Sequence, residues 1–316
     1  MPEHHPAAAS RDGPSGAVAV LLNPRPSAAA RLGGKRLAEL LMAAGCPDPV
    51  WIDAESAGGP APAVRAAVEA GAQLVLAAGG DGTARAAAQG LWGSRAVLGI
   101  IPLGTANVLA RNLGIPHEPE AAVRTALFGT ERAIDVGATG QGIFLVAAGL
   151  GLDARMMAAS ATGARHRIGM LAYLVSGLRH LGDPSFEVTV RCDDGIPIRR
   201  RVAAAMVGNV PRLPLGIQLG RHALVDDGQM EVVLIHPRGP AGWPRVAAAL
   251  LGTSDLGAVE RLPARRVEIG TPALQPMELD GDAVAQSAHL VAEVQPGALR
   301  VRVPAARRPG ETAGAG

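Results

Sequence analysis

The chain of 316 residues contains one lysine, Lys35, and all its other basic residues are arginine. A P-loop requires a glycine-lysine pair followed by Ser or Thr, but Lys35 is followed by Arg36. A protein kinase requires a lysine within a V-A-I-K strand, and the sequence has no such segment. Walker-type and protein-kinase chemistry are therefore excluded, and any phosphate chemistry proceeds without a catalytic lysine.

Aromatic residues are almost as scarce as lysine. The sequence has three Phe, three Trp and one Tyr, and its formal net charge is only +2. Proteins that bind nucleic acid typically combine a basic stripe with stacking aromatic side chains. We therefore expect no nucleic-acid partner.

Cysteines and long apolar runs are also few. Cys46 and Cys192 have no metal-ligand spacing, and no secretory signal pattern begins the chain. The longest apolar runs span about ten residues, whereas a membrane-spanning helix needs about 20. These features predict a protein of the reducing cytoplasm.

Hydrophobic residues make up 48% of the chain, and its length predicts about two domains. We expect disordered tails at 1–15 and 304–316, where small and polar residues dominate. Residues 16–136 alternate apolar runs with Ala-rich stretches, which is typical of a parallel sheet covered on both faces. Strands are expected at Val18–Leu22, Val50–Ile52, Leu74–Ala78 and Ala96–Ile101, and helices at Ala28–Ala44, Pro62–Ala70 and Thr83–Leu91.

Residues 137–303 have a different sequence pattern, in which short and often alternating apolar segments are separated by Gly, Pro and Asp. This pattern predicts a β-rich second domain with one helical insertion at about Asp153–Leu181. The expected strands are Phe186–Arg191, Arg199–Val207, Glu231–Ile235, Arg265–Ile269, Leu290–Val294 and Leu299–Val303.

The strongest local motif is Gly79-Gly80-Asp81-Gly82-Thr83, which follows a buried strand and opens a helix that we expect Thr83 to cap. Glycines let the backbone approach a ligand closely, and a helix N-terminus offers unpaired N–H groups to an anion. Asp81 would repel phosphate unless a divalent cation bridged them, so the motif favours a phosphate–Mg²⁺ arrangement. The alternative is a tight strand-to-helix turn in which Asp81 supports the cap.

A second Gly-Thr turn, Gly104-Thr105, follows the next strand along the chain. The carboxyl ends of neighbouring parallel strands face one crevice, where ligands bind. The two turns together predict a nucleotide site. A competing motif, Gly149–Ala154, fits the dinucleotide fingerprint, but the acid required about 20 residues later is missing, because Met170–Tyr173 is apolar.

A third motif places Asp280 and Asp282 on either side of Gly281. Glycine can bend the backbone and direct one carboxylate into a cleft, where it could act as a general base. The same residues also make an ordinary hairpin turn. Asp226-Asp227-Gly228 carries the same ambiguity.

The order and spacing of these motifs resemble the diacylglycerol kinase catalytic-domain family, and in particular its soluble bacterial lipid kinases. The resemblance covers about residues 17–303. The segments that carry it are Asn23-Pro24, Gly79–Thr83, Pro102–Asn107, Ala147–Ala154, Val207–Asn209, Val225–Gly228 and Leu279–Asp282.

This resemblance implies an N-terminal α/β nucleotide domain and a C-terminal β-sandwich, with the active site in the cleft between them. Phosphates of ATP would lie on Gly80–Ala86, and Asn23 would line the entrance. The nucleotide-binding residues implied are Asn23, Gly79, Gly80, Asp81, Gly82, Thr83, Ala84, Arg85, Gly104 and Thr105. The catalytic candidates are Asp282, as proton acceptor, together with Asp280 and Asp81.

The resemblance also implies a structural Mg²⁺ in the second domain. It would be held by the Asp227 carboxylate and by the carbonyls of Leu224 and Gln229. Asp135 would be a further acid linking this metal to the cleft through water.

Three departures from the family pattern concern the proposed chemistry. Asp282 stands where the family usually has Glu, Val108 where many members have Asp, and Arg85-Ala86 where an Asn-Glu pair is common. None removes the phosphate-binding backbone, but each alters a side chain near the expected site.

Together with the motifs, this resemblance implies an ATP- and Mg²⁺-dependent lipid kinase acting on diacylglycerol or a related lipid alcohol. Alternatives are a soluble-substrate kinase resembling NAD kinase, and a non-catalytic nucleotide or lipid sensor. Arg165–Val175 joins a basic start to an apolar stretch, as expected for peripheral contact with the inner membrane surface or for a core helix with a solvated end. We also consider a homodimer, although no residue pattern bears on the oligomeric state.

Overall fold

The computed structural model describes residues 17–23, 29–151, 185–220, 223–237, 239, 242–253 and 257–305. The first half of the chain alternates strands with helices, as its sequence predicts. Its elements are β1 (Ala17–Leu22), α1 (Ala29–Ala43), β2 (Val50–Trp51), α2 (Pro60–Glu69), β3 (Ala72–Gly79), α3 (Asp81–Leu91), β4 (Val97–Pro102), α4 (Val108–Asn112) and α5 (Pro119–Phe128).

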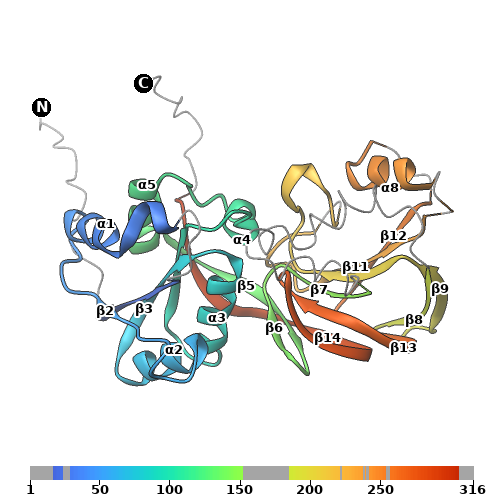
Figure 1. Ribbon diagram of the computed structural model, residues 1–316, viewed down its shortest axis with the longest axis horizontal. Helices are drawn as coiled ribbons and strands as arrows, with labels where there is room; N and C mark the ends of the chain where they lie inside the picture. Colours follow the sequence, from blue (N-terminus) through green and yellow to red (C-terminus); the bar gives the residue numbers. More distant parts are fainter. Residues whose placement is uncertain are drawn as a thin grey trace, which may run out of the picture.

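The strands of this half form a parallel sheet in the order β4-β3-β1-β2. Helices α1 and α5 cover one face and α2 and α3 cover the other (Figure 1). On β1, Val18 and Val20 pack under α1 and α5, whereas Ala19 and Leu21 pack toward α2 and α3. Strands β1, β3 and β4 are largely buried on both faces and therefore apolar, which is why these runs could be recognised in the sequence. The edge strand β2 differs, because Val50 and Trp51 are exposed.

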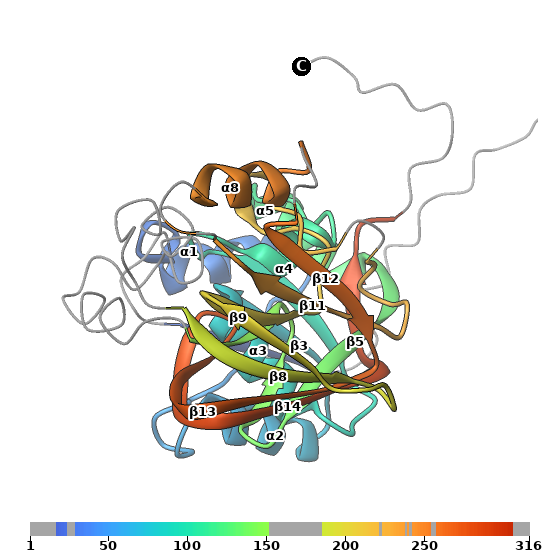
Figure 2. The ribbon, with the colours of Figure 1, turned by 90° about the vertical axis from the view of Figure 1, so that its right-hand side faces the viewer.

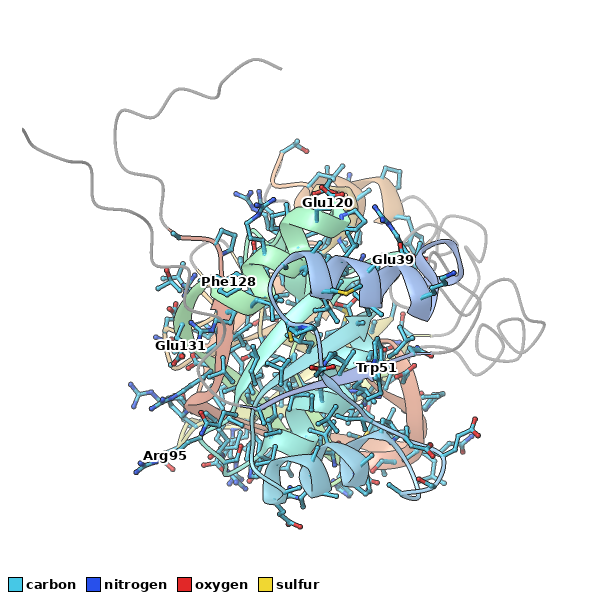
Figure 3. All side chains as sticks on the ribbon, turned by 90° about the vertical axis from the view of Figure 1, so that its left-hand side faces the viewer. Glu39, Trp51, Arg95, Glu120, Phe128 and Glu131 are labelled. Carbon is cyan, nitrogen blue, oxygen red and sulfur yellow. The ribbon has the colours of Figure 1, made fainter. Side chains whose placement is uncertain are left out.

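The outer end of this half shows an element that the sequence pattern did not reveal. Helix α5 lies beside α1, with Glu120 and Phe128 near its two ends (Figure 3). The carboxylate of Glu118 caps α5 by accepting hydrogen bonds from the amides of Glu120 and Ala121. A glutamate is an unusual cap, although Pro119 at the first helical position and Glu120 in the first turn are ordinary start signals.

The second half of the chain is mainly antiparallel. Its elements are β5 (Thr130–Thr139), β6 (Gly142–Phe144), β7 (Ala147–Leu150), β8 (Phe186–Cys192), β9 (Ile198–Val202), β10 (Ala204–Gly208), a short 3₁₀ turn (Pro214–Gly216), β11 (Met230–Ile235), α8 (Trp243–Leu250), β12 (Val259–Ala264), β13 (Arg266–Leu279) and β14 (Asp282–Val303). The expected helical insertion at 153–181 lies outside the described residues.

These strands curl around their own hydrophobic core (Figure 2). Two expectations are corrected here. Residues Arg199–Val207 form two strands rather than one, because the chain turns at Ala203 and β9 pairs with β8 while β10 pairs with β7 and β11. The two strands expected at Leu290–Val294 and Leu299–Val303 are parts of β14, which continues through a register shift between Gln295 and Leu299.

Strand β14 connects the two halves. It pairs with β13 and β5, and its end pairs in parallel with β4 at Val301 and Leu98. All the described strands therefore belong to one continuous sheet. The β13–β14 turn is thereby tied to the same sheet that carries the glycine-rich loop.

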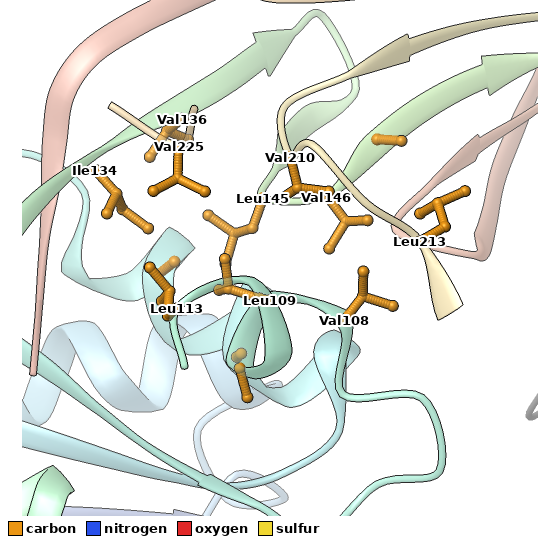
Figure 4. Packing of buried hydrophobic residues seen from close by; sticks show 14 of the residues in the cluster. Val108, Leu109, Leu113, Ile134, Val136, Leu145, Val146, Val210, Leu213 and Val225 are labelled. Atoms are coloured by element: carbon orange, nitrogen blue, oxygen red, sulfur yellow. The ribbon is translucent and has the colours of Figure 1, made fainter. Parts of the chain in front are cut away.

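Buried aliphatic side chains fill the junction between the halves. Leu109 and Leu113, in and just after α4, pack toward Ile134 of β5 and toward Leu145 and Val146 of the second half (Figure 4). These contacts hold the loop before α4 against the β-rich half.

Replacing Leu109 by alanine should destabilise the whole protein. Leu109 is 1% exposed, so the substitution leaves a cavity at the junction and should lower the free energy of unfolding by about 2–5 kcal/mol. Leu274→Ala is the matched control, because Leu274 is 64% exposed and its loss should cost within about 0.5 kcal/mol. Urea unfolding of the three proteins measures both values, and equal losses would contradict the packing described.

Candidate active site

The glycine-rich loop lies where β3 meets α3. Helix α3 begins at Asp81 and its N-cap residue is Gly80, which makes no side-chain capping bond. The expected cap by Thr83 is therefore wrong, because Thr83 already lies in the first helical turn. Its hydroxyl instead accepts a hydrogen bond of 3.2 Å from Nδ2 of Asn23, which ties the end of β1 to α3.

Backbone donors are unevenly distributed along this turn. The amides of Thr83 and Ala84 both donate to the Gly80 carbonyl, at 3.0 Å and 3.1 Å. The Ala84 side chain packs into the core. A bound phosphate would therefore receive its amide contacts from residues before Thr83, and contacts farther along α3 would come from side chains such as Arg85.

The two Gly-Thr turns lie directly against each other. The Gly79 carbonyl accepts hydrogen bonds from the amides of Leu103 and Gly104, at 2.9 Å and 3.2 Å. A Cβ at Gly104 would lie 2.5 Å from the Cα of Gly80 in the other turn, so only glycine fits there. Thr105 is exposed beside this contact. The predicted convergence of the two loops at one sheet edge is present.

Asp81 and Asn107 hold the second loop in place. Asn107 has a left-handed backbone, with φ 46°, and its side chain donates to and accepts from the backbone of Gly104. The Asp81 carboxylate accepts a 3.0 Å hydrogen bond from the Leu109 amide. Burial raises the pKa of Asp81, and hydrogen bonds from the Leu109 and Val108 amides oppose that rise. Asp81 thus supports the start of α4 rather than that of its own helix.

The β13–β14 turn brings a third group of residues to these loops. Asp280 and Gly281 both have positive φ, at 51° and 85°, which makes a tight turn. The Asp280 carboxylate accepts hydrogen bonds from three consecutive amides, those of Leu145, Val146 and Ala147, at 2.8–3.2 Å. Burial raises the pKa of Asp280 to about 6, although the three amides act in the opposite direction. This carboxylate serves as an anchor for the turn.

Asp282, two residues later, points toward the glycine-rich loop. Its Oδ2 accepts a 2.7 Å charged hydrogen bond from Nη2 of Arg85 on α3. A Cβ at Gly82 would lie 3.1 Å from the same oxygen. The Asp282 side chain is 54% exposed, whereas that of Arg85 is only 16% exposed. A solvent-accessible carboxylate therefore lies over the loop that the sequence predicts to bind phosphate.

Two further residues of this region were not singled out as site residues from the sequence. Glu278 on β13 is buried, and burial together with the charges of Asp280 and Asp282 raises its pKa to about 8. Asn209 donates from Nδ2 to the carbonyls of Asp135 and Leu145. Their burial depends on long-range packing, and no local sequence pattern reveals it.

The loop expected to bind a structural metal is well ordered by its own hydrogen bonds. The two oxygens of Asp227 accept from the amides of Leu224 and Gln229, at 2.9 Å and 3.0 Å. Asp226 forms a two-point ion pair with Arg132. The turn is thus more than a solvated bend, because it is tied to β5.

Asp135 lies beneath this loop and joins it to β14 at the register shift between Gln295 and Leu299. It is buried, and its two oxygens accept from the amides of Gly228 and Gly297, at 2.6 Å and 2.8 Å. Among the described residues, no group of three or more His, Cys, Asp or Glu side chains could hold a metal ion. Any cation at this loop would therefore be bound by one carboxylate, backbone carbonyls and water.

The dinucleotide alternative does not fit the geometry. Gly149 lies inside strand β7, opposite Met206 of β10 and Glu278 of β13, rather than in a turn between a strand and a helix. The stretch Arg165–Val175, a candidate for membrane contact, lies outside the described residues. No helix in the described ranges is long and apolar enough to cross a membrane.

Known proteins resemble both halves of the chain. Residues 17–139 match the family model of the diacylglycerol kinase catalytic domain, and residues 146–303 match the model of the YegS C-terminal NAD kinase beta sandwich-like domain. A protein of Pseudomonas putida named "Probable lipid kinase YegS-like" is 33% identical over 77% of this chain and 81% of its own length. One of the same name from Pseudomonas aeruginosa is 34% identical over 77% and 80%.

A solved structure shares the fold. The crystal structure of a diacylglycerol kinase from Bacillus anthracis superimposes with a TM-score of 0.72 at 23% identity, covering 91% of this chain and 96% of that one. The expected two-part architecture, a mixed α/β half followed by a β-sandwich-like half, is confirmed.

The buried acids make stability depend on pH. Glu278, whose usual pKa is 4.5, holds its proton up to about pH 8 in the fold, so the folded chain binds more protons than the unfolded chain between these values. Stability should therefore fall as pH rises through this window, and Glu278→Gln should make the fall shallower. Urea unfolding at several pH values measures this dependence, and parallel curves for the two proteins would contradict it.

Proposed function

Because the chain belongs to the lipid kinases that join a diacylglycerol kinase catalytic domain to a YegS-type C-terminal domain, we propose that it transfers the γ-phosphoryl group of ATP to the hydroxyl of diacylglycerol or a related lipid alcohol. The observation that carries this proposal is the ion pair between Arg85 and Asp282. It joins a carboxylate of the β-rich half to the glycine-rich loop of the α/β half, which is the juxtaposition that phosphoryl transfer requires.

The glycine-rich loop binds the triphosphate in this proposal. Backbone amides that precede Thr83 and the N-terminus of α3 face the phosphates, where oriented N–H groups stabilise negative charge. Asn23, Gly104 and Thr105 border the same loop. Arg85 supplies a fixed positive charge near the transferred group. In other kinases a lysine has this role, and this chain has no lysine in such a motif.

Asp282 then acts as the general base. Its carboxylate removes the proton from the lipid hydroxyl while that oxygen bonds to the γ-phosphorus, and the bond from phosphorus to the bridging oxygen breaks to release ADP. Because Asp282 is one methylene shorter than the usual glutamate, Arg85 serves to hold it at the required position. Its exposure leaves the second oxygen accessible to the acceptor.

Asp280 is a poorer candidate for the base. Its oxygens already accept hydrogen bonds from the amides of residues 145–147. If Asp280 took a proton from the substrate, these bonds, which anchor the turn, would be disrupted. We assign Asp280 a positioning role. Asp81 has a similar role toward α4, through its bond to the Leu109 amide.

The second-domain loop fits a weakly held, largely hydrated Mg²⁺. Each oxygen of Asp227 accepts one hydrogen bond from a backbone amide and has a further lone pair available. Mg²⁺ in proteins is often bound through one carboxylate and several waters. The carbonyls of Leu224 and Gln229 would complete the protein ligands, and Asp135 lies beneath the loop. A divalent cation that accompanies ATP would neutralise phosphate charge.

The acceptor lipid suggests where the protein works. ATP is a cytoplasmic metabolite and the acceptor resides in a bilayer, so the proposal includes peripheral contact with the inner membrane surface. The basic-apolar stretch Arg165–Val175 supports that contact through its sequence alone.

The proposed reaction predicts which molecules acquire phosphate. Purified protein given ATP labelled at the γ-phosphate should label a lipid of a total extract, whereas NAD offered separately should stay unlabelled. Thin-layer chromatography of the products measures both. Label in NAD would instead support a soluble-substrate kinase, and no label in any product with any divalent cation would support a non-catalytic sensor.

The two hairpin acids should respond differently to substitution. Asp282→Asn should lower kcat about 10²–10⁴-fold without lowering Tm, because an exposed base is lost, while ATP affinity persists. Asp282→Glu should retain substantial activity. Asp280→Asn should lower the free energy of unfolding by about 1–3 kcal/mol, because the Leu145 amide then faces an NH2 group in place of the Oδ2 acceptor. Normal turnover in Asp282→Asn beside an inactive, stable Asp280→Asn would reverse the assignment.

The metal loop can be tested by its response to magnesium. Adding Mg²⁺ to chelator-treated protein should raise Tm, and Asp227→Ala should abolish that rise. Because Asp227 also organises its loop through amide hydrogen bonds, the variant should start from a lower Tm even in EDTA. Asp193→Ala, which removes an amide-binding carboxylate on another turn, controls for this loss. Equal Mg²⁺ responses in all three proteins would contradict the site.

A further inference from the structure

Glu278 has an unusual environment for a carboxyl group. It lies on β13 between Gly149 of β7 and Ala283 of β14 and is 5% exposed. Its Oε1 is buried, and no hydrogen bond to it is present in the described part of the chain. Burying a polar group without a partner lowers stability, so such a group is expected to have a purpose beyond folding.

The position of Glu278 connects it to the proposed acceptor site. Within the β13–β14 hairpin, Glu278 lies two residues before the anchor Asp280 and four residues before the proposed base Asp282. Its neighbours across the sheet, Gly149 and Ala283, bring no polar or charged side chain. The charged groups that face it are Asp280 and Asp282, and the cation of this region, Arg85, is paired with Asp282.

These surroundings keep the carboxyl group protonated. Burial, and then the negative charges of Asp280 and Asp282, raise the pKa of Glu278 to about 8. A protonated carboxyl group carries an O–H donor. The hairpin therefore presents a buried donor beside an exposed base.

We propose that Glu278 contacts the acceptor lipid, with its carboxyl group donating a hydrogen bond to an uncharged oxygen of that lipid, either an ester carbonyl or a hydroxyl. The inference rests on the proposed lipid kinase function and adds a residue that selects the acceptor. An anionic head group would be repelled by Asp280 and Asp282, so the site favours a neutral glycerolipid.

Such a contact would act on specificity more than on the chemical step. A buried donor left unpaired disfavours substrates that lack the matching acceptor atom. Loss of the donor should therefore weaken use of the lipid while leaving the nucleotide unaffected. Removing the buried carboxyl group should also leave stability unchanged or raise it. A residue with a purely structural role would instead lower stability when it is removed.

The test uses the full chain with dioctanoylglycerol, which is dispersible in water, and the matching dioctyl ether, which lacks ester carbonyls. Glu278→Leu should lower kcat/KM for dioctanoylglycerol about tenfold, as expected for one lost hydrogen bond, with the KM for ATP unchanged and Tm equal or higher. Glu278→Gln keeps an N–H donor and should lose only about threefold. Glu187→Gln, at an exposed carboxylate on β8, is the control.

The outcomes separate the inference from the proposed function. If the loss in Glu278→Leu disappears with the ether, the contact is an ester carbonyl; if it persists, the contact is a hydroxyl, and either result supports the inference. Wild-type kcat/KM for the lipid in Glu278→Leu would overturn it, as would an equal loss in Gln and Leu variants with a lowered Tm. Failure of the wild-type protein to phosphorylate any lipid would overturn the proposed function itself.

Discussion

The candidate site depends on one buried carboxylate, that of Asp280. It accepts hydrogen bonds from the three consecutive backbone amides of residues 145–147. These bonds fix the β13–β14 turn against the strand that begins at Ala147. The left-handed backbone of Asp280 and Gly281 then reverses the chain at once, so that Asp282 emerges toward α3. Pairing of β13 with β7 and β14 also positions the hairpin, and the anchor adds the contact that holds the turn itself beside Arg85. An acid whose oxygens are already engaged in hydrogen bonds thus helps to determine where the proposed base, Asp282, lies.

The two halves of the protein contribute complementary parts to this site. The α/β half supplies glycine-rich turns whose backbones approach each other closely, and it carries the cation Arg85. The β-rich half supplies acids, and β14 runs through both halves so that the parts stay in register. Apolar side chains of α4 pack against the β-rich half and hold the two halves together next to the site (Figure 4). The acid from one half and the cation from the other are held together by the fold, before any substrate is present.

Much of this could be predicted from the sequence, because fully buried parallel strands and glycine turns leave local patterns. The positions of β1, β3 and β4, to within about two residues at each end, and the convergence of the Gly-Thr turns follow from such patterns. The cap assigned to Thr83 was wrong because the helix begins two residues earlier, at Asp81, where glycine residues on either side obscure the start signal. The burial of Glu278 and the anchoring role of Asp280 depend on strands more than 100 residues away in the sequence, so no local pattern contains them.

The central claim is that Arg85 and Asp282 work as one unit across the two halves. A double-mutant cycle on kcat/KM for the lipid, with Arg85→Ala, Asp282→Asn and the combined variant, tests it directly, since residues that act together give non-additive losses. Far-ultraviolet circular dichroism and Tm of each variant confirm that all are folded. The account predicts that the combined variant loses about as much rate as Asp282→Asn alone. Losses that multiply across the two substitutions would show that the two residues act independently and would contradict the account.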